Sequence, residues 1–472
     1  MKIPFVGPTY QMDAVSFDNQ RCVNFYPIAS ETGTSKSVTA LRSVPGYELF
    51  CELGGGPIRG GISTSDGRCF FVSGSGFYEV FSDGTNTLHG TLNSFVSRCQ
   101  LAENGTQVII VDGTDGYIFT LGTNVFAQIT DADFPTPAIS VDFIDGYFTV
   151  VKGGTAQFYI SALFDGTSWD AADFTTVESS PDDLVGLIAD HGNLWLFGKK
   201  TVEVYQNTGN ADFPFERIPG AIVQTGCADI NTVQKFDNSI AWLGVDDQGR
   251  GVVWKADGYN ALRFSTQAIE KKIATSEDFT DSFAAVYHEQ GHIFYCLQVK
   301  SLDTTLVYDG ATGMWHERQY RDTALGTDQQ HKMSCQVFFA QKNLIGDRLN
   351  GKVYSQSLNL YSFDGEEIIR TRITPHLAEE KRMITHGVLE LDMETGSGLV
   401  TGQGSDPQIM LQYSNDGGRT WSNELWKDIG EIGKYGTRVR WKRLGMARDR
   451  VYKVVISDPI FVQINDAYLN AT

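Results

Sequence analysis

The sequence has little that would form helices or enter a membrane. It contains only 13 prolines beside 49 glycines in 472 residues, a balance typical of an all-β chain with many tight turns. The best helix signal is short, with Ser265 as N-cap before residues 266–273. No apolar run approaches the ~20 residues that a membrane-spanning helix needs, and residues 1–5 lack the apolar core of a signal peptide. We therefore expect a protein that is synthesised and folded in a cytoplasm and has no contact with a membrane.

Cysteine does not occur in a pattern that would support disulfides. The count is seven, which is odd, and no two cysteines are close together in the sequence. Cys69 and Cys296 lie inside apolar runs. These features predict buried free thiols in a reducing compartment rather than a disulfide framework. The seven positions are Cys22, Cys51, Cys69, Cys99, Cys227, Cys296 and Cys335.

Positive charge is also in short supply, with 38 Lys and Arg against 57 Asp and Glu and a formal net charge of −19. This excludes a protein that binds phosphates over its whole surface. It is compatible with a soluble protein, or with a channel wall past which a polyanion should slide. The apolar content of 41% with 12% aromatic residues predicts a folded globular protein. The length exceeds one ordinary core, so two or three domains are expected.

A unit of two short strands recurs along most of the chain. In its clearest copy, Asn104 and Gly105 form a turn before the run Val108–Val111, and residues 117–121 return after a second turn. Because this run is apolar without alternation, both faces of the strand must be covered. The corresponding turn residues are 38, 41, 46, 46, 53 and 52 residues apart, close to the roughly 40–50-residue period of propeller repeats. They are Gly67, Gly105, Gly146, Gly192, Asn238, Gly291 and Asn343.

These repeats predict a β-propeller, in which each blade covers the faces of its neighbours. The copies fit seven blades, or six blades with a seventh hairpin shared in the closure, and six is slightly favoured. Neither WD dipeptides nor kelch glycine pairs recur, so the blades belong to neither of these repeat classes. The predicted buried strands are 69–72, 108–111, 147–151, 194–197, 240–243, 293–296 and 344–345.

The repeats divide the chain into three parts. Residues 1–55 do not fit the repeat, and we interpret them as an arm that pairs with the C-terminal domain. We interpret Gly54–Pro57 as a hinge. Residues 56–360 hold the propeller. From residue 361 strands follow without blade spacing, and we expect a β-sandwich-like assembly domain over 361–472. Its predicted strands are 389–393, 409–413, 439–441, 452–456 and 460–464.

Two motifs match functional signatures but fit hairpins better. Residues His288–His292 have the spacing of the zinc-protease motif, which brings both imidazoles to one metal only on a helix. Here strands flank the motif and Gly291 is a blade turn, so we expect a hairpin and no metal site. Ser414–Trp421 matches the Asp-box of sialidases, in which Ser and Asp side chains bond the amides of a tight turn. We expect no catalytic residues and no cofactor, because no nucleophile elbow or other catalytic arrangement can be placed.

One stretch reverses the charge of the chain. Between residues 427 and 453, nine Lys and Arg stand against three acidic residues. Cations alternate with apolar residues along one predicted strand, which places them on one face. A solvated face is the ordinary interpretation. We favour a contact with an acidic neighbouring subunit, because arginines beside a tryptophan are typical of interfaces. The candidate interface residues are Arg438, Arg440, Trp441, Lys442, Arg443, Arg448 and Arg450.

The run from Thr437 to Gly445 resembles the end of the packaged-DNA stabilisation proteins, which are the tail hub or nozzle subunits of short-tailed bacteriophages. Residues 193–198, 215–220 and 412–417 are similar to the same family, and the likeness includes chain length. The resemblance implies a homo-hexameric ring in the virion tail, below the portal and the head-to-tail adaptor protein. Such a ring continues the DNA channel and helps to retain packaged DNA without sequence-specific contact. It also docks tailspikes or tail fibres and a tail plug or needle.

Three functions are therefore considered. The first is a structural virion protein without enzymatic activity, whose acidic lumen would repel phosphates and let DNA pass quickly. The alternative is a propeller glycosidase or glycan-binding protein, sialidase-like because of the single Asp-box. The third is a general propeller scaffold for protein partners. The size of the protein in solution and on virions separates the structural virion protein from the other two. Hydrolysis of sialosides would favour the glycosidase.

Overall fold

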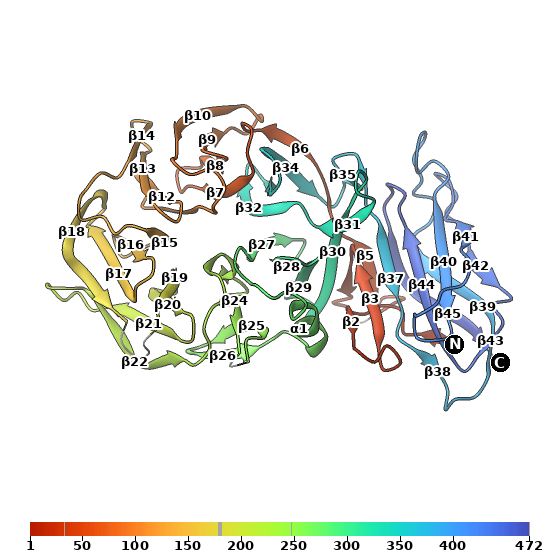
Figure 1. Cartoon of the computed structure of the whole chain (residues 1–472). Coiled ribbons are helices and arrows are strands. Elements are labelled where there is room, and N and C mark those ends of the chain that lie inside the picture. Colours follow the sequence, from red (N-terminus) through yellow and green to blue (C-terminus); the bar gives the residue numbers. More distant parts are fainter. Residues whose placement is uncertain (33, 178–181, 247, 472) are drawn as a thin grey trace.

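The computed structural model consists almost entirely of β-strands, arranged as a ring of sheets with a sandwich beside it (Figure 1). It describes residues 1–32, 34–177, 182–246 and 248–471. The only α-helix among these residues is α1 (Gln267–Ile273), and no described helix is long and apolar enough to span a bilayer. Its N-cap is Thr266, whose side chain accepts a hydrogen bond from the Ile269 amide, and not Ser265 as predicted. Ser265 instead donates its hydroxyl to Glu270. The all-β class is confirmed.

Seven four-stranded blades surround a common axis in the described part of the chain; five are separate sheets, and the other two belong to a 12-stranded and a 6-stranded sheet. The first four, from the axis outward, are β7 (Ile58–Ser63), β8 (Cys69–Ser73), β9 (Gly76–Val80) and β10 (Asn86–Thr91); β11 (Gln100–Glu103), β12 (Gln107–Val111), β13 (Gly116–Thr120) and β14 (Val125–Gln128); β15 (Ala138–Ile144), β16 (Tyr147–Lys152), β17 (Gln157–Ala162) and β18 (Asp165–Thr176); β19 (Leu184–Asp190), β20 (Asn193–Gly198), β21 (Val202–Asn207) and β22 (Phe215–Val223).

The last three blades complete the circle. They are β23 (Gln234–Lys235), β24 (Ile240–Val245), β25 (Gly251–Asp257) and β26 (Asn260–Arg263); β27 (Phe283–Glu289), β28 (His292–Gln298), β29 (Thr305–Asp309) and β30 (Met314–Asp322); β32 (Met333–Phe339), β33 (Lys342–Asp347), β34 (Lys352–Ser357) and β6 (Gly46–Glu52). The predicted propeller is confirmed. The sequence left six and seven blades open, with six slightly favoured. The topology has seven, because the seventh hairpin, β33 and β34, is part of a complete blade with β32 and β6.

Each predicted buried strand is the second strand of a blade, where sheet neighbours cover both edges and adjacent blades cover both faces. In β12, Val108–Val111 are 0% exposed. Between the first two blades, the ring centroids of Phe70 and Phe77 lie 5.2 and 5.4 Å from that of Phe119. Burying a side chain of this size contributes about 1.5–3 kcal/mol. The hairpins are therefore stabilised by their neighbours and could not persist singly.

Six of the seven predicted turn residues adopt the left-handed conformation, with φ between 54° and 92°. Glycine, and to a lesser extent asparagine, occupies this region without strain. The seventh prediction, Asn343, was wrong. Asn343 lies inside β33, and the turn is made by Ala340 and Gln341, with φ of 49° and 62°. This turn carries neither glycine nor asparagine, so no local pattern of residues indicates it.

The seventh blade is closed by a strand from the other end of the chain. β6 pairs antiparallel with β34, from Gly46 opposite Ser357 to Glu52 opposite Lys352. Residues 46–52 therefore belong to the propeller rather than to the N-terminal arm. The ring of Tyr47, on β6, stacks on Phe363 with centroids 4.8 Å apart. The two ends of the propeller chain are thus joined by hydrogen bonds and by aromatic packing.

Gly351 tests this closure. A Cβ at this position would lie 2.0 Å from the carbonyl oxygen of Leu53, beside the end of β6. We expect Gly351→Ala to lower the free energy of unfolding by about 1–3 kcal/mol, because the backbone must move to relieve the overlap. Chemical denaturation measures the loss. Gly55→Ala is the matched control, since a Cβ there meets nothing within 4 Å; equal stability of the two variants would contradict the closure.

The C-terminal part consists of two packed sheets built from both ends of the chain. One has the order β4-β5-β45-β39-β42, and the other continues from β30 through β3, β37, β44 and β40 to β41. The bounds are β3 (Asn19–Val23), β4 (Phe25–Ala29), β5 (Thr39–Ser43), β37 (Arg370–Ile373), β39 (Ile384–Met393), β40 (Gln408–Ser414), β41 (Leu425–Asp428), β42 (Val439–Lys442), β44 (Asp449–Ile456) and β45 (Gln463–Ala471). The strand predicted at 460–464 therefore begins at Gln463 and continues to Ala471.

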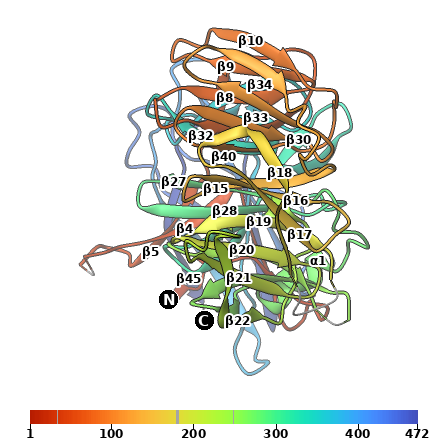
Figure 2. The same cartoon turned by 90° about the vertical axis from the view of Figure 1, so that its left-hand side faces the viewer.

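Short strands extend these sheets. β1 pairs with β45, β2 with β3, β31 with β30, β35 with β6 and β36, β38 with β44, and β43 with β39. Their bounds are β1 (Lys2–Ile3), β2 (Tyr10–Gln11), β31 (Thr327–Gln330), β35 (Ser362–Phe363), β36 (Glu366–Glu367), β38 (Leu377–Ala378) and β43 (Met446–Ala447). The hairpin between β4 and β5 projects from the body of the molecule (Figure 2).

Two fully buried arginines of β37 hold the N-terminal arm against the sandwich. The guanidinium of Arg372 donates to the carbonyl oxygens of Phe5 at 2.6 Å, Pro8 at 2.9 Å and Arg21 at 3.1 Å, and to the Gln20 side chain at 3.0 Å. Neighbouring Arg370 donates to the Ser43 hydroxyl and to backbone carbonyls. Both arginines are 0% exposed. The guanidinium groups of β37 donate hydrogen bonds to polar groups of the arm, so the hydrogen-bonding needs of both segments are met where they pack together.

Candidate functional site

The basic stretch of the sequence forms a groove between the last strands of the two sandwich sheets. β41 ends one sheet and β42 ends the other. The groove between them has a volume of about 650 Å³. It is lined by Glu424, Leu425, Trp426, Lys427, Arg438, Arg440, Trp441 and Lys442. We call it the basic groove, because four of these eight side chains are cationic.

The alternation predicted along this strand is present. Val439 and Trp441 point into the sandwich core, whereas Arg438 and Lys442 are exposed and Arg440 is half-buried. Trp441 is 2% exposed and donates its indole N–H to the Leu425 carbonyl oxygen of β41 at 2.8 Å. It therefore holds the two sheet edges together. The expectation that Trp441 contacts a partner was wrong, because a strand that exposes its cations must bury the side chains between them.

Arg450 is also part of the interior. It is 1% exposed, donates to the Asn415 side chain at 2.8 Å and to the Leu444 carbonyl oxygen at 2.6 Å, and lies 4.3 Å from the Tyr413 ring centroid. With these partners Arg450 supports a turn and cannot meet another subunit. Its assignment as an interface residue was wrong, because sequence charge does not reveal that a guanidinium is saturated by internal acceptors.

The remaining cations differ in whether they are paired. Arg438 forms a bidentate contact with Glu390 at 2.7 and 2.8 Å, and this hydrogen bonding and charge lower the pKa of Glu390. Among the described residues, no ion-pair partner exists for the exposed or half-buried cations Lys427, Arg440, Lys442, Arg443 and Arg448. Trp426 adds a side chain that is 52% exposed. The groove thus offers unpaired positive charge beside an exposed aromatic surface.

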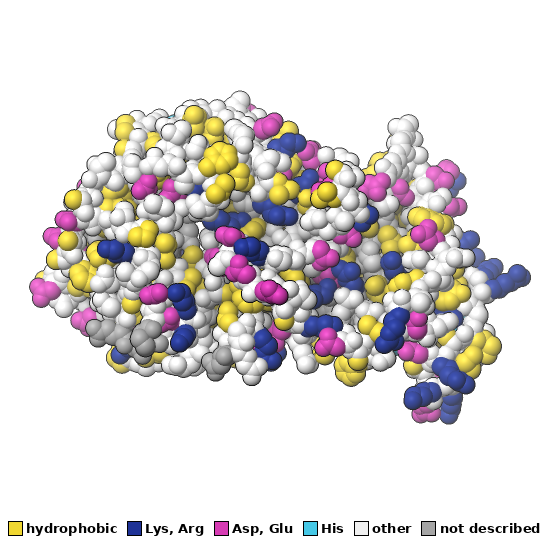
Figure 3. All heavy atoms as spheres, in the orientation of Figure 1, with side chains coloured by type: hydrophobic (Ala, Val, Ile, Leu, Met, Phe, Trp, Pro, Cys, Tyr) yellow, Lys and Arg dark blue, Asp and Glu magenta, His cyan; other side chains and the backbone are white. Residues whose placement is uncertain are grey.

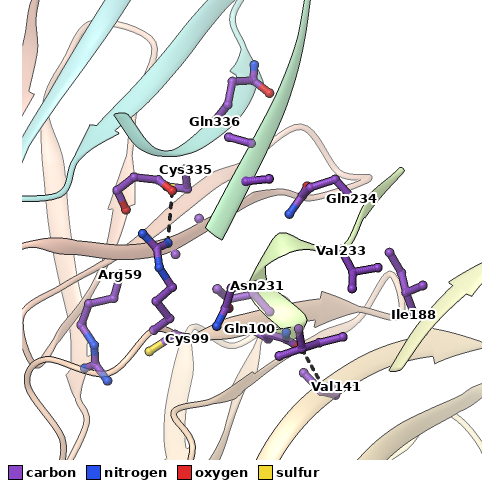
Figure 4. A pocket seen from close by; sticks show the side chains of 18 of the residues that line it. Arg59, Cys99, Gln100, Val141, Ile188, Asn231, Val233, Gln234, Cys335 and Gln336 are labelled. Carbon is purple, nitrogen blue, oxygen red and sulfur yellow. Dashed lines mark hydrogen bonds between the residues drawn. The ribbon is translucent and has the colours of Figure 1, made fainter. Parts of the chain in front are cut away.

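A second cavity of about 280 Å³ lies at the propeller axis, and Figure 4 shows Gln100, Asn231, Gln234 and Gln336 around it. Asp142 is the only carboxylate among its lining residues. Burial raises the pKa of Asp142, and its oxygens accept the backbone N–H groups of Phe143 at 2.8 Å and Ala189 at 2.7 Å. A single carboxyl held in this way lacks the second carboxyl that glycoside hydrolysis ordinarily requires.

The zinc-protease spacing falls on a hairpin, as predicted. His288 is the second-last residue of β27, His292 begins β28, and Gln290 and Gly291 form the turn between them. The two histidines therefore lie on either side of a turn and not on one helical face. The Nδ1 atom of His292 lies 2.9 Å from Asp309, which gives this histidine a role within its blade.

The Asp-box also has the expected structural role. Asp416 accepts hydrogen bonds from the amides of Arg419 and Thr420 at 2.9 Å, and Ser414 accepts one from the Gly418 amide at 2.8 Å. Hydrogen bonds from the Ser414 and Thr420 hydroxyls, with those from the Thr420 and Arg419 amides, hold the pKa of Asp416 well below its ordinary value. The box closes the turn after β40 in the sandwich, away from the propeller axis.

The cysteines agree with the prediction of free thiols. All seven are free, six are buried, and Cys335 is partly exposed. Burial raises the pKa of the Cys296 thiol to about 11 and that of Cys99 to about 12. Such thiols are protonated and unreactive at neutral pH.

Comparisons with known proteins cover nearly the whole chain. A family model described as the β-propeller of bacteriophage P22 Gp10 matches residues 1–359, and a second, described as the β-sandwich of the same protein, matches residues 369–472. The chain belongs to the P22 Gp10 family. The family models describe the same two architectures, in the same order, that the strand topology shows.

A curated relative within the Gp10 family is the tail hub protein gp10 of Salmonella phage P22. It is 22% identical over 466 residues, which cover 94% of this chain and 95% of the relative. Two solved structures show a weaker similarity. The extracellular domain of a hybrid two-component system from B. thetaiotaomicron has a TM-score of 0.45 at 10% identity, with 66% of this chain and 39% of that one covered. The N-terminal domain of Nup159 has a TM-score of 0.42 at 10% identity, with 71% and 98% covered.

Proposed function

We propose that this chain is a structural subunit of a phage tail hub and assembles as a homo-hexameric ring in the virion tail. The observation that carries the proposal is the match of both parts of the chain, in order, to the Gp10 family, together with a tail hub relative that aligns over 94% of the chain. The ring continues the DNA channel below the portal and the head-to-tail adaptor protein. It helps to retain packaged DNA and docks tailspikes or tail fibres and a tail plug or needle.

The character of the described surfaces supports a structural rather than an enzymatic role. The Asp-box is engaged in a turn, the zinc-protease spacing falls on a hairpin, and the axial cavity holds one carboxylate. The net charge of −19 suits a wall past which DNA moves without being held. The packaged DNA is accordingly a passing polyanion, without sequence-specific contact.

Assembly on the virion is the decisive experiment. We expect electron microscopy of phage particles to place six copies of this chain in one ring below the adaptor, and native mass spectrometry of the detached ring to give six times the chain mass. Particles that carry a different number of copies would contradict the hexamer. Hydrolysis of sialosides by the purified chain, at a rate that the substitution Asp142→Asn abolishes, would contradict the structural role itself.

A further inference from the structure

The basic groove lies at one end of the long axis of the molecule, and an acidic strand lies at the other. In Figure 1, β18 marks the outer rim of the propeller on one side and β41 and β42 the far side of the sandwich. Figure 3 shows carboxylates along the margin at the β18 end and a gathering of Lys and Arg at the opposite margin. A chain with opposite charges at its two ends can bind copies of itself head to tail.

β18 is the outermost strand of its blade, with only β17 beside it in the sheet. It runs for 12 residues, and a strand edge of this length ordinarily needs a cover or a charge to prevent non-specific pairing. Five carboxylates gather around it: Asp131, Asp133, Asp165, Asp170 and Asp173. We call this set the acidic edge. None of the five forms an ion pair with a described residue.

Apolar side chains accompany the charges of the acidic edge. Phe164 is 57% exposed and Phe174 is 36% exposed. Partial burial and, to a smaller extent, the neighbouring charge of Asp170 raise the pKa of Asp173. The acidic edge therefore combines unpaired negative charge with exposed aromatic rings. The basic groove combines unpaired positive charge with the exposed ring of Trp426.

We infer that the acidic edge of one copy docks in the basic groove of the next copy, so that each subunit interface of the tail hub pairs opposite ends of the chain. The inference rests on the proposed ring. A second copy of this chain is the occupant that the charges favour, since both surfaces are unpaired and their signs are opposite. Because the contact joins two different patches, it is heterologous, and it makes a ring when the rotation closes. Nucleic acid fits the groove less well, because Glu424 lines it and Glu390 already neutralises Arg438.

Charge reversal tests the contact from both sides. The groove variant carries Arg440→Glu and Lys442→Glu, and the edge variant carries Asp170→Lys and Asp173→Lys. We expect each variant alone to lose at least about tenfold in the fraction of chain assembled at fixed concentration, because like charges then face each other. A mixture of the two variants should assemble again, with both species alternating in each ring, since every groove then meets an edge of opposite sign.

The control and the contrary outcomes separate this inference from the proposed function. Lys200→Glu with Lys342→Glu changes the net charge as the groove variant does, on exposed propeller residues, and should leave assembly unchanged. Native mass spectrometry and electron microscopy of complemented particles give the readout. Variant rings that form as readily as wild-type rings would overturn the inference and leave the ring standing. A wild-type chain that forms no ring on the particle would overturn both.

Discussion

Replacing Glu317 by glutamine is expected to lower the free energy of unfolding by about 3–5 kcal/mol, the usual loss when one partner of a buried ion pair is removed. Glu317, on β30, is 0% exposed. It accepts from the guanidinium of Arg21 at 2.6 and 3.2 Å and lies 2.8 Å from the ammonium of Lys272. The carboxylate thus joins the arm, the helix α1 and a propeller blade. Without it, two cations share a buried site with no counter-charge.

The matched control is Glu366→Gln. Glu366 pairs with Lys332 at 2.9 Å, but its side chain is 35% exposed. Water therefore replaces the lost contact, and we expect a change of less than about 1 kcal/mol. Urea denaturation of both variants measures the difference. Similar losses in the two variants would show that the Glu317 cluster does not hold the arm to the propeller.

Glu317 also gives the protein a defined sensitivity to acid. Burial alone would raise the pKa of this carboxyl, but Arg21 and Lys272 hold the pKa far below the ordinary value of 4.5. The folded protein therefore binds fewer protons here than the unfolded chain does. Its contribution to stability is complete above about pH 4.5 and is lost progressively as the pH falls below that value. Between pH 5 and pH 3, wild-type stability should fall more steeply than that of Glu317→Gln; parallel curves would contradict the linkage.

Replacing Arg372 by methionine is the second large effect that we expect. Methionine fills similar volume but leaves the carbonyl oxygens of Phe5, Pro8 and Arg21 without their donor. Each buried acceptor left unsatisfied costs about 1–3 kcal/mol, so the loss should be about 3 kcal/mol or more. The release should be local first, and limited proteolysis should cut residues 1–43 faster than any propeller loop.

The control for Arg372 is Arg321→Met. The Arg321 side chain is 41% exposed and pairs with Asp328 at 2.9 Å on the propeller, so its removal should leave the arm as resistant to protease as in the wild type. If Arg372→Met kept its arm equally protected, the guanidinium would be dispensable and the pairing of β1 and β5 with β45 would suffice.

The propeller was predictable because its signal is local. Runs such as Val108–Val111 are apolar without alternation, and Gly105 before them supplies the positive φ of the turn. Both signals lie within ten residues of each other in the sequence. Where a turn used ordinary residues, as at Ala340 and Gln341, the strand was predicted but its turn residue was placed wrongly.

What could not be predicted depends on contacts between distant segments. Nothing in residues 46–52 indicates that they pair with β34, some three hundred residues away. Likewise, Arg450 and Arg448 look equivalent in the sequence, yet one is saturated by internal acceptors and the other is exposed. The sequence predicted the charged face of one strand but not the groove. The groove exists because β41 and β42, which end two different sheets, become neighbours when the sheets pack.

The closure of the seventh blade has a consequence for how the subunit is made. β6 leaves the ribosome early, whereas β34, its partner, follows only after six blades have been translated, and β45, the partner of β1 and β5, follows later still. The first segment must therefore stay unpaired until those partners have been synthesised. A copy whose translation stops before β34 and β45 can complete neither the seventh blade nor the sandwich sheet.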